Sequence, residues 1–242
     1  MNHYGYLNFI KRTRRLASIE RCSNTQHIQN YDVAQHSFFI SLYTKLFADL
    51  ENKRLIKNPE SQTIDTLKAI EMALIHDLEE CVTGDLLYPF KHGVGIPKTM
   101  KRNLSSAVTL VIETHVNEEL FKELPEIIRN SYIRLWKQSK TSGLEGLLVE
   151  AMDKFEILIF ALEEMDMGNM QMKPIYMTAM IILLKNYSIF ESLIEVLFDI
   201  NKYYKDKFIN DCCRKEGNGK VDNLIDIAKD EIEKQSNYNW RT

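Results

Sequence analysis

Apolar residues recur every three to four positions along most of the chain, which is the spacing that one face of an α-helix presents to a core. The strongest pattern covers residues 144–167. The same period predicts helices over six further segments: residues 7–20, 33–50, 63–81, 98–122, 124–139 and 174–209, the last as one long helix or a kinked pair. Only 9 Gly and 5 Pro occur, too few for the tight turns of a β-sandwich or barrel. The predicted fold class is therefore all-α.

Several helix ends carry recognisable signals. Asp32 is expected to cap the helix that begins at Val33, and Gly84 is expected to stop the 63–81 helix. Residues 86–97 contain two prolines and two glycines and are expected as an extended loop, of a length that is often functional. Six apolar side chains of the 33–50 helix are expected to face inward: Val33, Phe38, Phe39, Leu42, Leu46 and Phe47.

Hydrophobic residues make up 45% of the 242 residues, which is enough for one sizeable core. We expect a single helical domain over residues 1–209. Residues 210–242 are expected as a polar extension packed on the same domain, with a loop at 216–220 and a helix at 221–235.

Charge and cysteine content narrow the classes of function. The formal net charge of -3 does not indicate a nucleic-acid polymer as partner. Four cysteines without a CxxC pair indicate reduced thiols rather than a zinc knuckle. The most apolar segment, residues 175–184, is too short for a bilayer, which needs about 20 residues, and no secretory signal is visible. A cytoplasmic protein without membrane or nucleic-acid partners is therefore expected.

Two metal-capable side chains, His76 and Asp77, stand in a row at the end of an apolar helix. Burying both is costly unless something pairs them. On a helix, Glu80 lies four positions after His76 and three after Asp77, so all three side chains can point into one cleft.

Two further residues of the same kind interrupt apolar stretches. His36 lies 40 residues earlier among apolar residues, and Asp153 lies 76 residues after Asp77 in the apolar stripe of the 144–167 helix. Helices of a bundle can bring such ligands together in the core. Two histidines and two aspartates favour one divalent ion that accepts nitrogen and oxygen ligands, such as Mn, Co, Fe, Zn or Mg, and of these Co, Mn and Mg are the preferred candidates.

The order H…HD…D is shared with the HD-domain phosphohydrolases, and three local strings extend the likeness. Residues 33–37 (VAQHS), 76–85 (HDLEECVTGD) and 151–154 (AMDK) resemble the bacterial HD-domain 5′-deoxynucleotidases, over about residues 10–200 of the chain. The resemblance implies an HD-domain helical bundle with a metal site in its core. It also implies a metal-dependent hydrolase that converts deoxynucleoside 5′-monophosphates to nucleoside and phosphate, and a homodimer, for which the aromatic-rich region 174–204 is a candidate interface.

The resemblance also implies roles for single residues. The metal ligands would be His36, His76, Asp77 and Asp153. Glu80 would orient or activate the attacking water, Arg21 would orient the phosphate, and Asp85 would contact the substrate and help to place the sugar. The substrate-binding set would be Arg21, Cys22, Asp85, Leu86, Leu87 and Tyr88.

Three positions depart from the family pattern. Cys22 stands where a tryptophan is typical, Gln35 stands where an acidic residue is typical, and residues 86–89 read LLYP in place of LPTP. None of these is a metal ligand. The first and the third lie where the nucleoside is expected, so base and sugar preference stay open.

Two alternatives remain. A deoxynucleoside triphosphate triphosphohydrolase would need more cations than Arg21, Lys91 and the basic run at residues 11–15 supply. A non-catalytic HD-like module that binds a nucleotide would be favoured by loss of a metal ligand or of Glu80, and all five residues are present.

Overall fold

The computed structural model describes residues 5–55, 62–87, 96–141, 143–208 and 223. Within these ranges the structure is helical, and its only β-pairing is an isolated bridge between Glu20 and Asp32. The prediction of an all-α fold is confirmed. No helix of the described part combines the length and the apolar character needed to cross a membrane.

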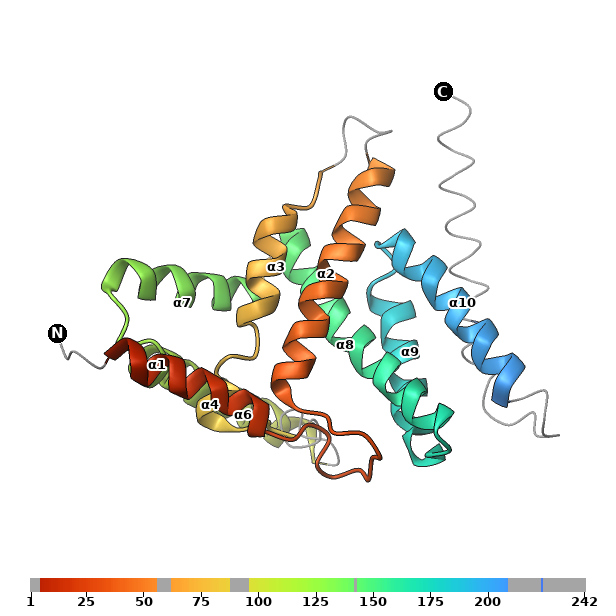
Figure 1. The fold of residues 1–242 in the computed structure, drawn as a ribbon, viewed down its shortest axis with the longest axis horizontal. Coiled ribbons are helices and arrows are strands. Elements are labelled where there is room, and N and C mark those ends of the chain that lie inside the picture. Colours follow the sequence, from red (N-terminus) through yellow and green to blue (C-terminus); the bar gives the residue numbers. More distant parts are fainter. Residues whose placement is uncertain (1–4, 56–61, 88–95, 142, 209–222, 224–242) are drawn as a thin grey trace.

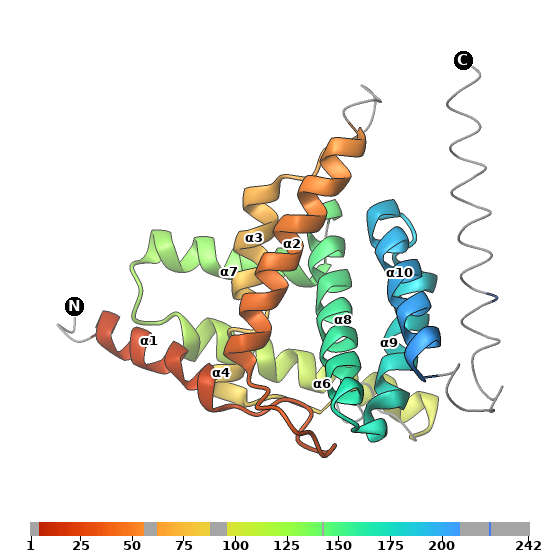
Figure 2. The same cartoon turned by 45° about the vertical axis from the view of Figure 1, so that its right-hand side comes forward.

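Two long helices and a shorter one form the centre of the bundle (Figures 1 and 2). Helix α2 (Val33–Leu55) packs against α3 (Thr66–Ile75) and against α8 (Gly143–Asp166), and α7 (Glu126–Thr141) packs on both α3 and α8. On the other side, α8 packs on α9 (Lys173–Asn186), which contacts α10 (Glu191–Phe208).

The other elements that precede α7 gather at the end of the bundle where α2 begins (Figure 1). They are α1 (Gly5–Thr13), a 3-10 turn (Arg14–Ser18), α4 (Glu80–Thr83) and α6 (Lys98–His115), which continues as a π-helical turn (Val116–Leu120). A second 3-10 turn, Met170–Met172, precedes α9.

The core consists of two hydrophobic clusters. One joins α2, α3, α8, α9 and α10 around Phe47, Met152 and Leu193, and the other lies beneath α1, α4, α6 and α7 around Val116 and Trp136. Both are continuous with the residues that flank the His-Asp pair, since Ala73 belongs to the first cluster and Ile75 to the second. The turn after α3 is therefore held between two packed regions.

The predicted stop and start signals are confirmed. The Asp32 carboxylate accepts a hydrogen bond from the Gln35 amide at 2.8 Å, as a cap does. Gly84 has φ +73° and ends α4, a conformation that glycine adopts without steric cost. In contrast, the helix predicted over residues 63–81 is interrupted, because α3 ends at Ile75 and a turn separates it from α4.

The predicted inward face of α2 is wrong for four of its six residues. Val33 and Phe47 are buried, whereas the exposed fractions of Phe38, Phe39, Leu42 and Leu46 are 62%, 39%, 49% and 50%. The buried face also uses small polar residues, among them Ser37 and Ser41, whose hydroxyls donate to the carbonyls four residues earlier at 2.8 and 2.7 Å. Small, internally satisfied side chains let α2 approach its neighbours closely, and this sets the rotation of the helix.

Other boundaries shift because of long-range contacts. Helix α2 continues to Leu55, beyond its predicted end, where Arg54 pairs with Glu191 and with Glu195 (2.8 Å) of α10. Of the two possibilities for the segment that begins at residue 174, one long helix or a kinked pair, the structure has two helices, α9 and α10. In that region Tyr176, Phe190 and Tyr204 are buried in the chain's own core, so these rings are not available for an interface, and the homodimer stays a prediction. The loop at 216–220 and the helix at 221–235 lie outside the described residues, apart from 223, so the boundary at residue 209 stays a prediction as well.

Candidate metal centre and substrate cavity

The fold brings the four predicted metal ligands together from separate elements. His36 lies on α2, His76 and Asp77 lie in the turn after α3, and Asp153 lies on α8. One nitrogen or oxygen atom of each lies within 4.8 Å of the others. His36 Nε2 is 3.1 Å from Asp153 Oδ1 and 3.5 Å from Asp77 Oδ2, and His76 Nε2 is 3.1 Å from Asp77 Oδ2.

Hydrogen bonds orient both imidazoles. His76 Nδ1 donates to the Ala73 carbonyl at 2.7 Å, and His36 Nδ1 lies 2.6 Å from a carboxylate oxygen of Glu156, which also accepts the Tyr31 hydroxyl. The Nε2 atoms of His36 and His76 are buried and make no hydrogen bond. Orphaned polar atoms of this kind are rare in a folded protein. Two free imidazole nitrogens facing two carboxylates fit one divalent cation.

The carboxylates of the cluster differ in their electrostatics. Burial alone would raise the pKa of Asp77, but His76 and Lys140 hold it well below its usual range. Burial would also raise the pKa of Asp153, but Lys154 and His36 hold it well below its usual range. Burial and the charge of Asp77 raise the pKa of Glu80 to about 9, and Glu80 Oε2 is buried without a hydrogen-bond partner. Glu80 is therefore the carboxyl group of the site most ready to hold a proton.

Arg21 extends over the cluster from the segment before α2. Its guanidinium nitrogens lie 3.3 Å from Asp77 Oδ2, 3.9 Å from Glu80 Oε2 and 3.7 Å from Asp153 Oδ1. The next residue, Cys22, has φ +52°, a left-handed conformation that non-glycine residues rarely adopt. Burial raises the pKa of the Cys22 thiol to about 11, so the group is a neutral thiol near neutral pH.

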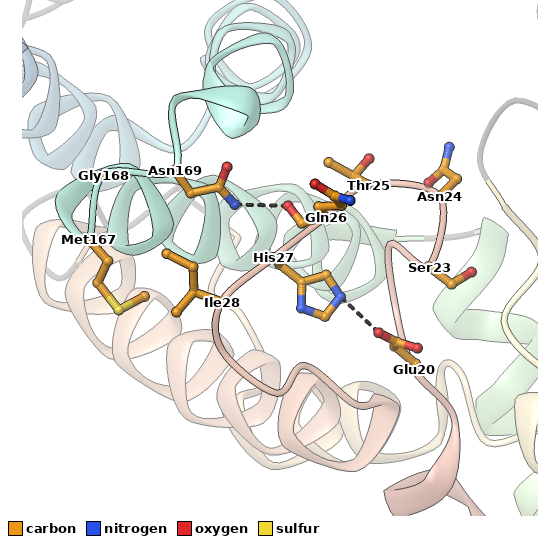
Figure 3. Close-up of a pocket in the computed structure, with 10 residues that line it drawn as sticks. All are labelled: Glu20, Ser23, Asn24, Thr25, Gln26, His27, Ile28, Met167, Gly168 and Asn169. Carbon is orange, nitrogen blue, oxygen red and sulfur yellow. Dashed lines mark hydrogen bonds and ion pairs between the residues drawn. The ribbon is translucent and has the colours of Figure 1, made fainter.

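The segment that carries Arg21 is anchored at its other end on the last turn of α8. An open pocket lies there between residues 20–28 and residues 167–169 (Figure 3), and its volume is about 720 Å³. In it Asn169 donates to the Gln26 carbonyl at 2.8 Å, and His27 lies 3.2 Å from Glu20. Glu164 accepts the backbone amides of residues 28 and 29 at 2.7 and 2.8 Å. These contacts hold the loop that follows Arg21 against the end of α8, and the pocket lies between the two.

A cavity of about 570 Å³ opens from the cluster. Most of the residues predicted for the site line it: Arg21, Cys22, His76, Asp77, Glu80, Asp85, Leu86, Leu87 and Asp153. His36, the remaining member of the cluster, is fully buried and does not line the cavity. Tyr88 and Lys91 lie outside the described residues.

Several residues of the site are absent from the predicted set. Lys140 and Lys154 line the cavity, and so do Ile175, Ala179 and Ile182 of α9. Lys154 follows Asp153 directly, so its ion pair with that residue (2.5 Å) has a signal in the sequence. Glu156 lies three positions after Asp153 on α8, a spacing that places both side chains on one face of the helix. Lys140 has no such signal, because only the packing of α7 brings it to Asp77.

The helical fold and the H…HD…D cluster define the class of the protein as an HD-domain protein. Solved structures agree in fold. An HD-domain phosphohydrolase from Listeria innocua superposes with a TM-score of 0.64 at 22% identity, over 95% of this chain and 99% of that one. The PH0347 protein from Pyrococcus horikoshii superposes with a TM-score of 0.60 at 20% identity, over 81% and 98%.

The family follows from the sequence comparison. The model of the YfbR-like 5′-deoxynucleotidase family matches residues 8–207, and the chain belongs to this family. Relatives include a 5′-deoxynucleotidase from Erwinia tasmaniensis, 27% identical over 163 residues that make up 67% of this chain and 75% of the relative. The 5′-deoxynucleotidase HDDC2 of Dictyostelium discoideum is 29% identical over 66% of this chain and 77% of the relative.

Replacing Glu156 should weaken metal binding through His36. In Glu156→Gln the amide can donate to Nδ1, which favours the tautomer that carries its proton on the metal-facing Nε2. We expect the affinity for Mn²⁺ or Co²⁺ to fall by about 10- to 100-fold, the usual effect of losing such a partner. Calorimetric titration of metal-stripped protein measures this.

Glu145→Gln is the matched control. Glu145 is a buried carboxylate of the same helix, but it accepts hydrogen bonds from the Asp65 backbone amide and the Lys68 ammonium. It should bind the metal as the wild type does. Equal affinities of Glu156→Gln and wild type would contradict the role assigned to Glu156.

Proposed function

We propose that the protein hydrolyses deoxynucleoside 5′-monophosphates to a deoxynucleoside and inorganic phosphate. The observation that carries the proposal is the polarity of the cavity. Its lining combines the His-Asp cluster and Arg21 with apolar residues of α9 such as Ile175 and Ile182. A nucleoside monophosphate likewise combines an anionic phosphate with a flat base whose faces are apolar. Family membership and the relatives named 5′-deoxynucleotidase support the same substrate class.

His36, His76, Asp77 and Asp153 would hold one divalent ion, with Co, Mn or Mg as candidates. When bound, such an ion neutralises phosphoryl charge and lowers the pKa of water. The proposed ligand atoms are imidazole nitrogens and carboxylate oxygens, the ligand types that these ions accept.

The chain's own residues would carry the rest of the reaction. Arg21 offers a planar pair of N–H donors that fits a phosphate. The pKa of about 9 for Glu80 belongs to the metal-free site, where burial and the charge of Asp77 raise it. With that charge offset by a cation, Glu80 would take a proton from the attacking water as the water oxygen bonds to phosphorus. The bond from phosphorus to the 5′-oxygen then breaks, and the departing 5′-oxygen would receive the proton that Glu80 took from the water. Asp85, Leu86 and Leu87 would place the sugar and the base.

The alternative of a triphosphatase depends on how many cations the cavity offers to a phosphate chain, and the structure adds two lysines to that number while removing the basic run. Lys140 and Lys154 line the cavity, whereas the basic run at residues 11–15 does not, and Arg12 within it pairs with Glu123 at 2.8 Å. Both lysines already pair with site aspartates, at 3.1 and 2.5 Å. Their positive charge is therefore largely neutralised by these aspartates and is not free to hold a triphosphate, so the monophosphate stays the preferred substrate.

Phosphate release from a panel of deoxy- and ribonucleoside mono- and triphosphates tests the proposal. Metal-stripped protein is re-supplied with Co²⁺, Mn²⁺ or Mg²⁺ before each assay. Orthophosphate from deoxynucleoside monophosphates is the expected result. Tripolyphosphate from triphosphates would replace it with the second candidate, and a folded, metal-bound protein without turnover would leave a nucleotide-binding module.

A further inference from the structure

The two aspartates of the cluster use their oxygens in the same divided way. Asp77 directs Oδ2 toward His36 and His76, while Lys140 Nζ holds Oδ1 at 3.1 Å. Asp153 directs Oδ1 toward His36, while Lys154 holds Oδ2 at 2.5 Å. Each carboxylate is thus clamped between the cluster and an ammonium group.

The clamp on Asp77 belongs to a longer buried chain of contacts. Lys140 Nζ also lies 3.2 Å from Glu79 Oε1, and Glu79 Oε2 accepts a hydrogen bond from the Trp136 indole N–H at 2.7 Å. The Trp136 ring lies 5.9 Å from the Lys140 ammonium. Glu79 and Trp136 are 3% and 4% exposed, so both ends of this arrangement are packed in the core.

The geometry points to Lys140 as a positioning residue for Asp77, an inference that rests on the proposed metal-dependent function. Lys140 reaches Asp77 from α7, an element that supplies none of the four predicted ligands. Its ammonium bridges Asp77 and Glu79, two carboxylates that would otherwise repel each other in a region of low dielectric. With Oδ1 held, Oδ2 keeps its direction toward the two histidines.

The loss of a nearby positive charge and the loss of an orienting group change the affinity for a cation in opposite directions, so a metal titration distinguishes them. Removing a positive charge near a cation site should by itself strengthen cation binding. Removing a group that orients a ligand should weaken cation binding, commonly by about 10- to 100-fold. The inference therefore predicts that Lys140→Met binds Mn²⁺ and Co²⁺ about tenfold or more weakly than the wild type.

The experiment is calorimetric titration of the metal-stripped full chain with Mn²⁺ and Co²⁺, without nucleotide, together with the visible spectrum of the Co²⁺ form. Because no substrate is present, the result is independent of which nucleotide the protein hydrolyses. Lys140→Arg keeps a charged donor between the two carboxylates and should retain most of the affinity and the wild-type spectrum. Lys68→Met removes a comparably exposed lysine, paired with Glu145 at 3.3 Å, and should change neither readout.

Equal or tighter metal binding in Lys140→Met, with an unchanged Co²⁺ spectrum, would overturn the inference. In that case a raised KM for the nucleotide would instead identify Lys140 as a phosphate contact. Should Lys140→Met fail to fold, Glu79→Gln provides the second test, since it loosens the other anchor of the same ammonium. Because the loss of a carboxylate charge weakens cation binding by itself, the deciding readout for this variant is the Co²⁺ spectrum, which should differ from that of the wild type. An unchanged spectrum in Glu79→Gln would overturn the inference equally.

Discussion

Asp77→Asn should abolish metal-dependent phosphate release, with a fall in rate of at least about 1,000-fold, since a cation supplies several kcal/mol of charge stabilisation in the transition state. Asp77 is the centre of the cluster. Its carboxylate lies within 3.5 Å of His36, His76, Arg21 and Lys140. Asparagine keeps the volume but removes the charge that would bind the cation.

The measurement pairs the rate of phosphate release with calorimetric metal binding, and circular dichroism checks the fold. Asp166→Asn is the matched control, because Asp166 lies at the end of α8 and binds Tyr203 and Lys207 at 2.9 and 2.7 Å, away from the cavity. It should behave as the wild type. A folded Asp77→Asn protein with a rate within tenfold of wild type would refute the metal site proposed here.

Glu80→Gln should lower kcat by about 100- to 10,000-fold, the usual contribution of a general base, while metal affinity changes little. Glu80 lines the cavity next to Asp77 and Arg21 but is not among the four predicted ligands. Glutamine keeps its shape and cannot take a proton from water. Steady-state kinetics with a deoxynucleoside monophosphate and metal titration separate the two effects.

Glu51→Gln is the control for Glu80→Gln. Glu51 is also buried, and burial also raises its pKa, but it bonds the Ser192 amide at 2.7 Å outside the cavity. Its kcat should equal that of the wild type. If Glu80→Gln lost metal binding as well as activity, Glu80 would be a ligand and not the base.

The raised pKa of Glu80 also predicts how the metal-free protein responds to pH. Its folded-state pKa of about 9 exceeds the ordinary value of 4.5, so its contribution to stability is complete below about pH 4.5 and is lost as the pH rises toward 9. Glutamine does not titrate. Without metal, the melting temperature of Glu80→Gln relative to that of the wild type should therefore rise as the pH increases from 5 to 8.

The sequence alone determined the helical class, several helix ends and the members of the cluster. Periodicity is a local property, and so are the cap at Asp32 and the stop at Gly84, because each depends on neighbours within one turn. His76, Asp77 and Asp153 were recognisable because polar, metal-capable groups are costly in apolar stretches.

Only the tertiary structure decided which face of α2 is buried, where α3 breaks and which residues support the cluster. Helical spacing fixes the angle between side chains but not the rotation of a helix that is apolar on most sides, so Phe38 and Leu42 were assigned to the wrong face. Lys140 and Glu156 contact Asp77 and His36 across 63 and 120 residues of sequence. Pairings at that separation depend on how α7 and α8 pack against the rest of the bundle, and no local pattern in the chain specifies the partners.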